Sequence, residues 1–233
     1  MKEVPTLPCC EGFENLDLTK VDVSFLMGLS RIIDLTDINL YATIMCIFFN
    51  PVFWNVTARW EFYTKRLSTM FGSPFRGCVA LAVPIIFFVC LRDIQYETTL
   101  KSQPKWELLQ TMPVSKTAAS GLLAVGMTLV IWSFWTLGFT GTFFGDYFGI
   151  LLDQKVTKFP YNIPYDPMYL GSTLNFLGLA IWHASPVGFI LTGLVGTSYH
   201  VALKYERPFT DAIYRQKELR IASQKRELNK KES

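Results

Sequence analysis

Four stretches of this chain contain no Asp, Glu, Lys or Arg, and they constrain its fold more than any other feature. They are residues 38–58, 77–91, 117–145 and 167–203. A helix that crosses a bilayer needs about 20 mostly apolar residues. The last two stretches exceed this length and the first meets it. The second meets it if the apolar residues 70–75 belong to the same helix and Arg76 reaches out to the membrane surface.

The composition favours a membrane protein over a soluble one. Half of the 233 residues are hydrophobic and 18% are charged, below the roughly 25% of a typical soluble domain. The segment 122–132 is apolar on all sides and offers no charged face to water. A chain of this length cannot bury four such helices and still cover them with polar surface. We therefore predict an all-α integral membrane protein with three to four transmembrane helices.

Two prolines divide the apolar stretches. Pro51 removes a helix hydrogen bond and disfavours helix at Asn50, so the first stretch is either a kinked span or a segment that enters the membrane and returns. We favour the second form, a re-entrant or intramembrane N-terminal helix. The fourth stretch has 37 residues, and a helix of that length would cover about 55 Å. It should break near Pro186, which leaves 187–203 as the last span.

The charged residues suggest three regions and an orientation. We expect a polar N-terminal tail at 1–37, a membrane domain at 38–204 and a basic tail at 205–233. Lys and Arg concentrate in the cytosolic flanks of membrane proteins. The tail from Lys204 onward has nine basic and five acidic residues, and the loop 92–116 has four basic residues.

By this criterion the tail and the loop 92–116 are cytosolic. The loop 146–166 has only two basic residues, which agrees. The segment 59–76 has four and fits poorly, so the topology there stays open.

Nothing in the sequence indicates a nucleic-acid partner or a metal. The net charge is +3, too small for a nucleic-acid binder. The two histidines lie 17 positions apart without other ligands in a metal-binding pattern. The sequence leaves open whether the chain forms a homo-oligomer.

Polar groups in apolar segments are costly and often functional. Those of this chain are Asn50, Asn55, Asp146, Asn175, His183 and His200, with Glu206 directly after the last span. A structural role, hydrogen-bonded between helices, is at least as plausible for each. The repeated glycines of 121–149 have the same two interpretations, close helix packing or close approach of a ligand.

Several long motifs resemble one enzyme family. They are LGFTGTFFGDYFGIL at 137–151, VTKFPYN at 156–162, DPMYLGST at 166–173, HASP at 183–186, FNPVFWN at 49–55 and ARWE at 58–61. Together they are similar to the phosphatidylethanolamine N-methyltransferase family, and the resemblance covers about residues 38–217.

The resemblance implies three successive methyl transfers from S-adenosylmethionine to the headgroup amine of phosphatidylethanolamine, which yield phosphatidylcholine. It also implies the endoplasmic reticulum and associated mitochondrial membranes as the location. In the family, the methyl donor is attributed to a Gly-x-Gly in one membrane helix and a Glu-Glu pair after the last one. Here these positions read Ala124-Val125-Gly126 and Glu206-Arg207, so each motif keeps half of its pattern.

The chemistry requires a base for the headgroup amine and a site at the membrane–water boundary. His183 and Asp146 are the candidate bases. Gly126 lies ten residues after Lys116, and Glu206 lies two after Lys204, so we expect both near one membrane face.

Further side chains have expected roles at this site. Glu206 is expected to bind the ribose or ammonium of the donor, or else to pair with a neighbouring cation. Arg207 suits a lipid phosphate. Asn162 and Tyr169 lie in well-matched motifs and are expected to shape the headgroup site. Aromatic faces attract methylated ammonium groups, and the candidates for this role are Trp132, Trp135, Tyr147 and Trp182.

Three other functions remain open. An isoprenylcysteine carboxyl methyltransferase shares the weak element 166–171 with this family. A catalytically inactive homologue is compatible with the changed Ala124 and Arg207. A membrane scaffold or small transporter is also possible, although a transporter should show two matching halves, which this chain lacks.

Overall fold

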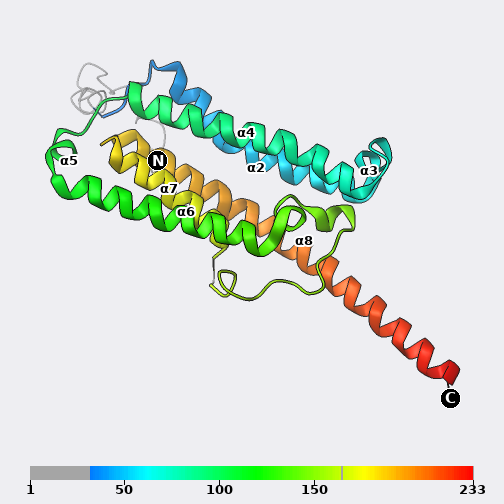
Figure 1. Ribbon diagram of the computed structural model, residues 1–233. Coiled ribbons are helices and arrows are strands. Elements are labelled where there is room, and N and C mark those ends of the chain that lie inside the picture. The colour runs from blue at the N-terminus through cyan, green and yellow to red at the C-terminus, as the bar shows by residue number, and fades with distance from the viewer. Residues whose placement is uncertain (1–31, 164, 233) are drawn as a thin grey trace, which may run out of the picture.

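The computed structural model describes residues 32–163 and 165–232, and this part of the chain contains helices and no strands (Figure 1). The helices are α2 (Ile38–Thr64), α3 (Arg66–Met70), α4 (Pro74–Ser102), α5 (Glu107–Thr111), α6 (Pro113–Thr142), the 3₁₀ helix η2 (Gly145–Phe148), α7 (Pro167–Trp182) and α8 (Pro186–Glu232). Most of the predicted N-terminal tail, residues 1–31, lies outside the described residues.

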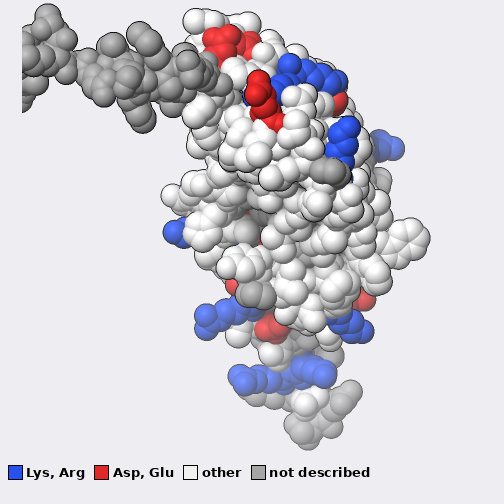
Figure 2. Space-filling view, turned by 90° about the vertical axis from the view of Figure 1, so that its left-hand side faces the viewer, with Lys and Arg blue, Asp and Glu red and all other residues white. Residues whose placement is uncertain are grey.

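Four helical segments are long and apolar enough to cross a membrane. They are α2, α4, the segment Val114–Phe148 and α8. On the face drawn in Figure 2, charged side chains gather toward the top and the bottom, and nearly all of the surface between them is uncharged. The predicted all-α membrane fold is therefore confirmed.

The first apolar stretch differs from the favoured expectation that it enters the membrane and returns. α2 continues through Pro51 as one helix of 27 residues, begun by Asp37, whose side chain accepts a hydrogen bond from the Asn39 backbone. Pro51 lacks one helix hydrogen bond, but the helix does not end there, because packing against α4 supports this part of α2. Asn50 is buried and donates to the Phe88 carbonyl of α4 at 3.1 Å. Asn50 thus has the structural role.

The fourth stretch breaks where the sequence predicts. α7 ends at Trp182, and α8 begins with Pro186. With 16 residues, α7 is too short to count among the candidate spans. α8 continues beyond the apolar part to Glu232, so the last span and the basic tail form one helix (Figure 1).

Helix contacts divide the bundle into two packed groups. α2 packs on α4, α7 packs along α6, and α8 contacts both α2 and α7 and so joins the two groups. At the α6–α7 contact, Gly126 and Gly171 face each other so closely that a Cβ on either would lie 2.6 Å from the other's carbonyl oxygen. α4 and α6 share no extensive contact, which leaves a space between the two groups.

The order of the helices corrects the predicted orientation. The loop after α4 lies beside the start of α8, where the Trp106 backbone donates to the Ala184 carbonyl. The tail leaves from the other end of α8, beside the end of α2, where Arg59 donates to the Tyr205 carbonyl at 2.6 Å. The loop 92–116 and the tail are therefore at opposite ends of the bundle (Figure 1). The basic segment 59–76, which fitted poorly before, shares an end with the tail.

Candidate active site

A cavity of about 1000 Å³ occupies the space between the two helix groups. α2, α4, α6, α7 and α8 all contribute to its wall, as does the segment between α6 and α7. Polar side chains from distant parts of the sequence meet in this wall. The arrangement suits an amphipathic ligand, because the α4 and α6 sides are mostly apolar.

Glu206 is the centre of the polar part of this cavity. Its Oε1 accepts hydrogen bonds from Trp54 Nε1 at 2.9 Å and from Asn55 Nδ2 at 2.7 Å, both on α2. The Tyr169 hydroxyl of α7 lies 2.9 Å from Oε2. Side chains of α2 and α7 thus hold the carboxylate that α8 carries, which fixes its position for a ligand.

Local sequence explains how Tyr169 reaches this position. Asp166 begins α7, because its side chain accepts hydrogen bonds from the Met168 and Tyr169 backbone N–H groups, and Pro167 follows at the first helical position. Tyr169 then lies in the first turn, next to α8. Its ring stacks on Tyr199 of α8, with centroids 4.4 Å apart.

Asp166 and Asp146 add two carboxylates to the cavity wall. Burial raises the pKa of Asp166, although the backbone hydrogen bonds from Tyr169 and Met168 and the positive charge of Arg207 oppose this effect. Asp146 accepts a hydrogen bond from the Thr210 hydroxyl of α8 at 3.1 Å. Of the two candidate bases, Asp146 therefore lies in the cavity.

His183 lies elsewhere in the bundle. It follows α7 at the end of the molecule where α4 ends, and its Nε2 is 4.0 Å from Glu97 Oε1. It does not line the cavity. Burial and then the positive charge of Lys105 lower the pKa of His183. The geometry therefore gives this histidine no access to a ligand in the cavity.

The Ala124-Val125-Gly126 motif also lies outside the cavity wall. Ala124 and Val125 are exposed on the outer side of α6, and Gly126 is buried against Gly171 and Asn175 of α7. The expectation that Gly126 and Glu206 lie near one face assumed that Lys116 and Lys204 flank the same side. They lie at opposite ends of the bundle, since α6 and α8 both run from the α5 end toward the tail (Figure 1).

The remaining candidates divide between the cavity and the surface. Tyr169, Asn175, Glu206 and Arg207 line the cavity, whereas Asn162 and His200 are exposed and do not. Trp132, Trp135 and Trp182 are also exposed and away from it, and Tyr147 is buried beside Phe209. The aromatic residues of the wall are instead Trp54, Phe134, Phe143, Phe144, Tyr161, Tyr165, Tyr169, Tyr199 and Tyr214.

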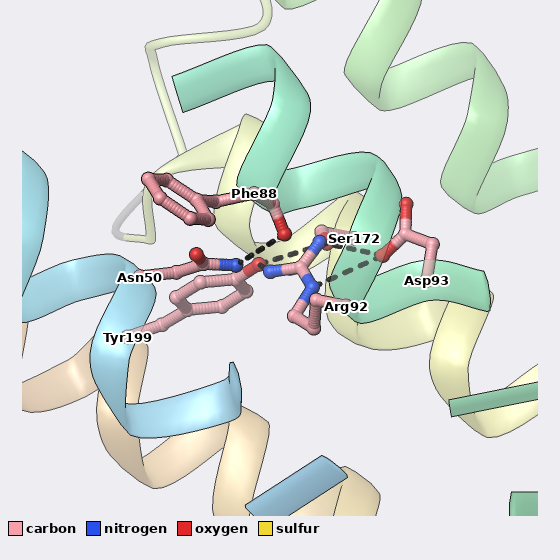
Figure 3. Close-up of polar contacts among 6 residues, drawn as sticks. All are labelled: Asn50, Phe88, Arg92, Asp93, Ser172 and Tyr199. Atoms are coloured by element: carbon pink, nitrogen blue, oxygen red, sulfur yellow. Dashed lines mark hydrogen bonds and ion pairs between the residues drawn. The ribbon is translucent and has the colours of Figure 1, made fainter. Parts of the chain in front are cut away.

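Arg92 is a cavity residue that the sequence reasoning missed. It lies inside α4 and only 5% of its side chain is exposed. Figure 3 shows its guanidinium between Tyr199 and Asp93, with dashed lines to both, and Tyr199 in turn bonded to Ser172. The residue served only as the boundary of an apolar stretch. The sign that Arg92 lies inside the bundle is that its helix continues for ten residues beyond it.

The described residues contain no group of three or more His, Cys, Asp or Glu side chains that could hold a metal ion. The polar wall is instead rich in acceptors and hydroxyl groups. This donor set suits a cationic, hydroxyl-bearing organic ligand better than a metal.

Comparison with known proteins agrees with the family that the motifs suggest. Residues 114–217 match the family model described as "Phospholipid methyltransferase". The chain is 51% identical over 185 residues to the human phosphatidylethanolamine N-methyltransferase, which covers 79% of this chain and 92% of that protein.

Fungal relatives match as well. The chain is 42% identical over 182 residues to the Saccharomyces cerevisiae phosphatidyl-N-methylethanolamine N-methyltransferase, covering 78% of this chain and 88% of that protein. No solved structure matches this chain.

Proposed function

Because the chain belongs to the phospholipid methyltransferase family, we propose that it methylates the headgroup amine of phosphatidylethanolamine and so makes phosphatidylcholine. The observation that carries this function is the 51% identity to the human enzyme over 92% of that enzyme's length. A cavity between membrane helices, polar at Glu206 and apolar along α4 and α6, suits a phospholipid.

We propose that all three methyl transfers occur at this one site. The names of the relatives differ on this point, since the animal enzymes are named for phosphatidylethanolamine and the fungal ones for its monomethyl form. An isoprenylcysteine methyltransferase, an inactive homologue, a scaffold and a transporter are not favoured by these relatives.

The methyl donor of the proposed reaction is S-adenosylmethionine, which when bound supplies an electrophilic sulfonium methyl group. Its ammonium and ribose hydroxyls need hydrogen-bond acceptors, and the cavity wall provides them. Among the described residues, the hydrogen bond that Glu206 Oε2 is shown to accept comes from the Tyr169 hydroxyl, and a carboxylate oxygen has room for a further donor. The buried Oδ1 atom of Asn175, which lines the cavity, has no hydrogen-bond partner among the described residues.

Glu206 is therefore the residue we assign to the donor, with Tyr169, Trp54 and Asn55 as positioning residues. Arg207 also lines the cavity, and its charge lies near Asp166. The structure gives Ala124 and Val125 no contact with this cavity, so we assign them no role in donor binding.

Asp146 is the residue we assign to the amine proton. The headgroup amine must lose a proton before it can attack a methyl group. Asp146 is a carboxylate in the cavity wall, and Thr210 holds one of its oxygens while the Tyr147 backbone N–H donates to the other. His183 does not line the cavity and is assigned no part in this step.

We propose the endoplasmic reticulum membrane, and associated mitochondrial membranes, as the location. The tail and the basic segment 59–76 share one end of the bundle, and positive flanks face the cytosol, so the C-terminus is cytosolic. Glu206 follows Lys204, the first charged residue after the apolar part of α8. The polar end of the cavity then lies near the cytosolic boundary, where a soluble donor can enter.

The test expresses this chain in cells that lack phosphatidylethanolamine methylation and supplies their microsomes with methyl-labelled S-adenosylmethionine. Label in the mono-, di- and trimethylated lipids is expected. Membrane-inserted protein that labels no phospholipid would contradict the function. Label only when the monomethyl lipid is supplied would contradict the first of the three steps.

Glu206→Gln tests the donor assignment separately. It keeps the size and part of the hydrogen bonding of Glu206 but removes the charge, so the Michaelis constant for the donor should rise about tenfold or more. Exposed Glu218→Gln on the same helix is the control. An unchanged constant in a well-folded Glu206 variant would remove Glu206 from the donor site.

A further inference from the structure

The guanidinium of Arg92 is a deeply placed charged group of the cavity wall, and the assignments above leave it without a function. It lies ten positions before the last residue of α4, about 15 Å from that end. A charge this deep in a membrane-spanning helix is costly and usually serves a function. Phe176 covers one side of it, with the guanidinium carbon 4.8 Å from the ring centroid.

The described residues satisfy only part of the hydrogen-bonding capacity of Arg92. Its Nε and Nη2 donate to Asp93 Oδ1, and its Nη1 donates to the Tyr199 hydroxyl. These bonds use three of the five N–H groups of a guanidinium. Asp93 is 52% exposed, so the pair is not sealed within the protein. Because Arg92 lines the cavity, an oxyanion there can take the two N–H groups that remain.

The α4 and α6 sides of this cavity carry an apolar surface. It consists of Ile85, Ile86 and Val89 on α4, and of Met127, Val130, Ile131 and Phe134 on α6. Since α4 and α6 share no extensive contact, this wall borders the side from which a lipid in the bilayer can enter. The anionic headgroup of a lipid, which carries long apolar chains, fits these surroundings better than a water-soluble anion does.

We propose that Arg92 binds the phosphodiester of the lipid substrate, an inference that rests on the proposed function. The headgroup of phosphatidylethanolamine carries a phosphate and an ammonium a few bonds apart. Arg92 meets the first charge, and the carboxylate of Asp146 lies in the same cavity for the second. Arg92 would thereby orient the headgroup so that the amine, and not the phosphate, lies at the polar end.

A binding assay without turnover tests this directly. The probe is phosphatidylmethanol, a phosphodiester lipid that has no amine, and the readout is the rise in thermal unfolding temperature of the solubilised full-length protein. Wild-type protein should be stabilised by this lipid and not by the diacylglycerol of equal chain length. Equal effects of the two lipids would overturn a phosphate site.

Variants of Arg92 then test whether this residue forms the phosphate site. Arg92→Gln should weaken phosphatidylmethanol binding about tenfold or more, and Arg92→Lys should lie between this variant and wild type, because an ammonium keeps the charge but not the planar fork. Arg76→Gln, the same change on the exposed arginine of α4, is the control. In kinetics, Arg92→Gln should raise the Michaelis constant for the lipid more than it lowers kcat.

A carboxylate has similar chemistry, and the methyl donor carries one. S-adenosylhomocysteine, which shares that carboxylate, is therefore measured in parallel, and its affinity should stay within about twofold in Arg92→Gln. A tenfold loss here, with unchanged phosphatidylmethanol binding, would overturn the proposal in favour of the donor.

Three further outcomes are decisive. Unchanged binding of both ligands with a lower unfolding temperature would show a purely structural arginine. If Arg92→Gln does not fold, phosphatidylmethanol binding by Arg92→Lys that equals wild type would overturn the proposal. A wild-type protein that binds phosphatidylmethanol yet methylates no lipid would contradict the proposed function but not the phosphate site.

Discussion

Tyr169 and Tyr199 stack with ring centroids 4.4 Å apart, and this pair joins the two polar halves of the cavity. The Tyr169 hydroxyl donates to Glu206, whereas the Tyr199 hydroxyl accepts a hydrogen bond from Arg92. A carboxylate and a guanidinium from distant sequence positions are thus held at fixed places without contacting each other. The two can therefore bind opposite charges of ligands in one cavity.

The hydrogen bond from Tyr169 to Glu206 gives a first prediction. Tyr169→Phe keeps the stacked ring and removes only the hydroxyl. Because a hydrogen bond to a charged group contributes about 1.5–3 kcal/mol, the donor's Michaelis constant should rise by roughly 10- to 100-fold. Tyr205→Phe, which changes an exposed ring next to Glu206, should leave kinetics unaltered. Equal kinetics for both variants would mean that the hydroxyl does not position Glu206.

The glycine contact between α6 and α7 gives a second prediction. A Cβ at position 126 would lie 2.4 Å from Asn175 Oδ1 and 2.6 Å from the Gly171 carbonyl oxygen, so Gly126→Ala must push the helices apart. We expect a loss of about 1–3 kcal/mol in the free energy of unfolding, seen as a lower unfolding temperature. Gly121→Ala is the control, since a Cβ there meets open space. A stable Gly126→Ala protein with weaker donor binding would restore the ligand-approach interpretation.

The altered first residue of the Gly-x-Gly motif gives a third prediction. Ala124 is exposed on α6 and does not line the cavity. Ala124→Gly should therefore leave the donor's Michaelis constant unchanged and cost about 0.5–1 kcal/mol of helix stability. Measured donor kinetics that improve on this change would show that the outer face of α6 reaches the cofactor after all.

Sequence patterns predicted those parts of the fold that depend on neighbouring residues. Missing charges located the four candidate spans, and Pro186 located the break after α7. Pro51 misled the prediction, because a proline's local cost can be offset by packing. Asn50, which donates to α4 from the adjacent position, is part of that packing.

The site could be predicted only where one residue signalled its own role. Glu206 and Asp146 stand out as carboxylates at the edges of apolar stretches. The Trp54–Glu206 contact joins residues 152 positions apart, and no local pattern encodes it. Arg92 escaped notice because a charge that ends an apolar stretch looks the same whether it lies at the membrane surface or inside the bundle.

Asp166 gives a fourth prediction, on pH. Burial raises its pKa above the ordinary 3.8 of an aspartate side chain, so the folded protein holds the proton more tightly than the unfolded chain. The contribution of Asp166 to the free energy of unfolding is then greatest below pH 3.8, the ordinary pKa of an aspartate. It declines as the pH rises through the pKa of Asp166 in the folded protein. Asp166→Asn still caps α7 but does not titrate.

The measurement is the difference in unfolding temperature between wild type and Asp166→Asn. The unfolding temperature of wild type should fall relative to that of the variant as the pH rises from about 4 to neutral. Exposed Asp153→Asn should show no such trend. A difference that grows in favour of wild type with rising pH would mean that the carboxylate is stabilised when ionised.

The helix order gives a fifth prediction, on topology. The loop before α6 and the tail of α8 lie at opposite ends of the bundle, whereas the tail and α3 share one end (Figure 1). In a variant whose five native cysteines are replaced, a single cysteine at position 109 should therefore react with a membrane-impermeant maleimide from the side opposite to single cysteines at positions 69 and 224. Positive flanks place positions 69 and 224 in the cytosol. Labelling of 109 and 224 from the same side would contradict the arrangement, because α6 and α8 would then have to run in opposite directions.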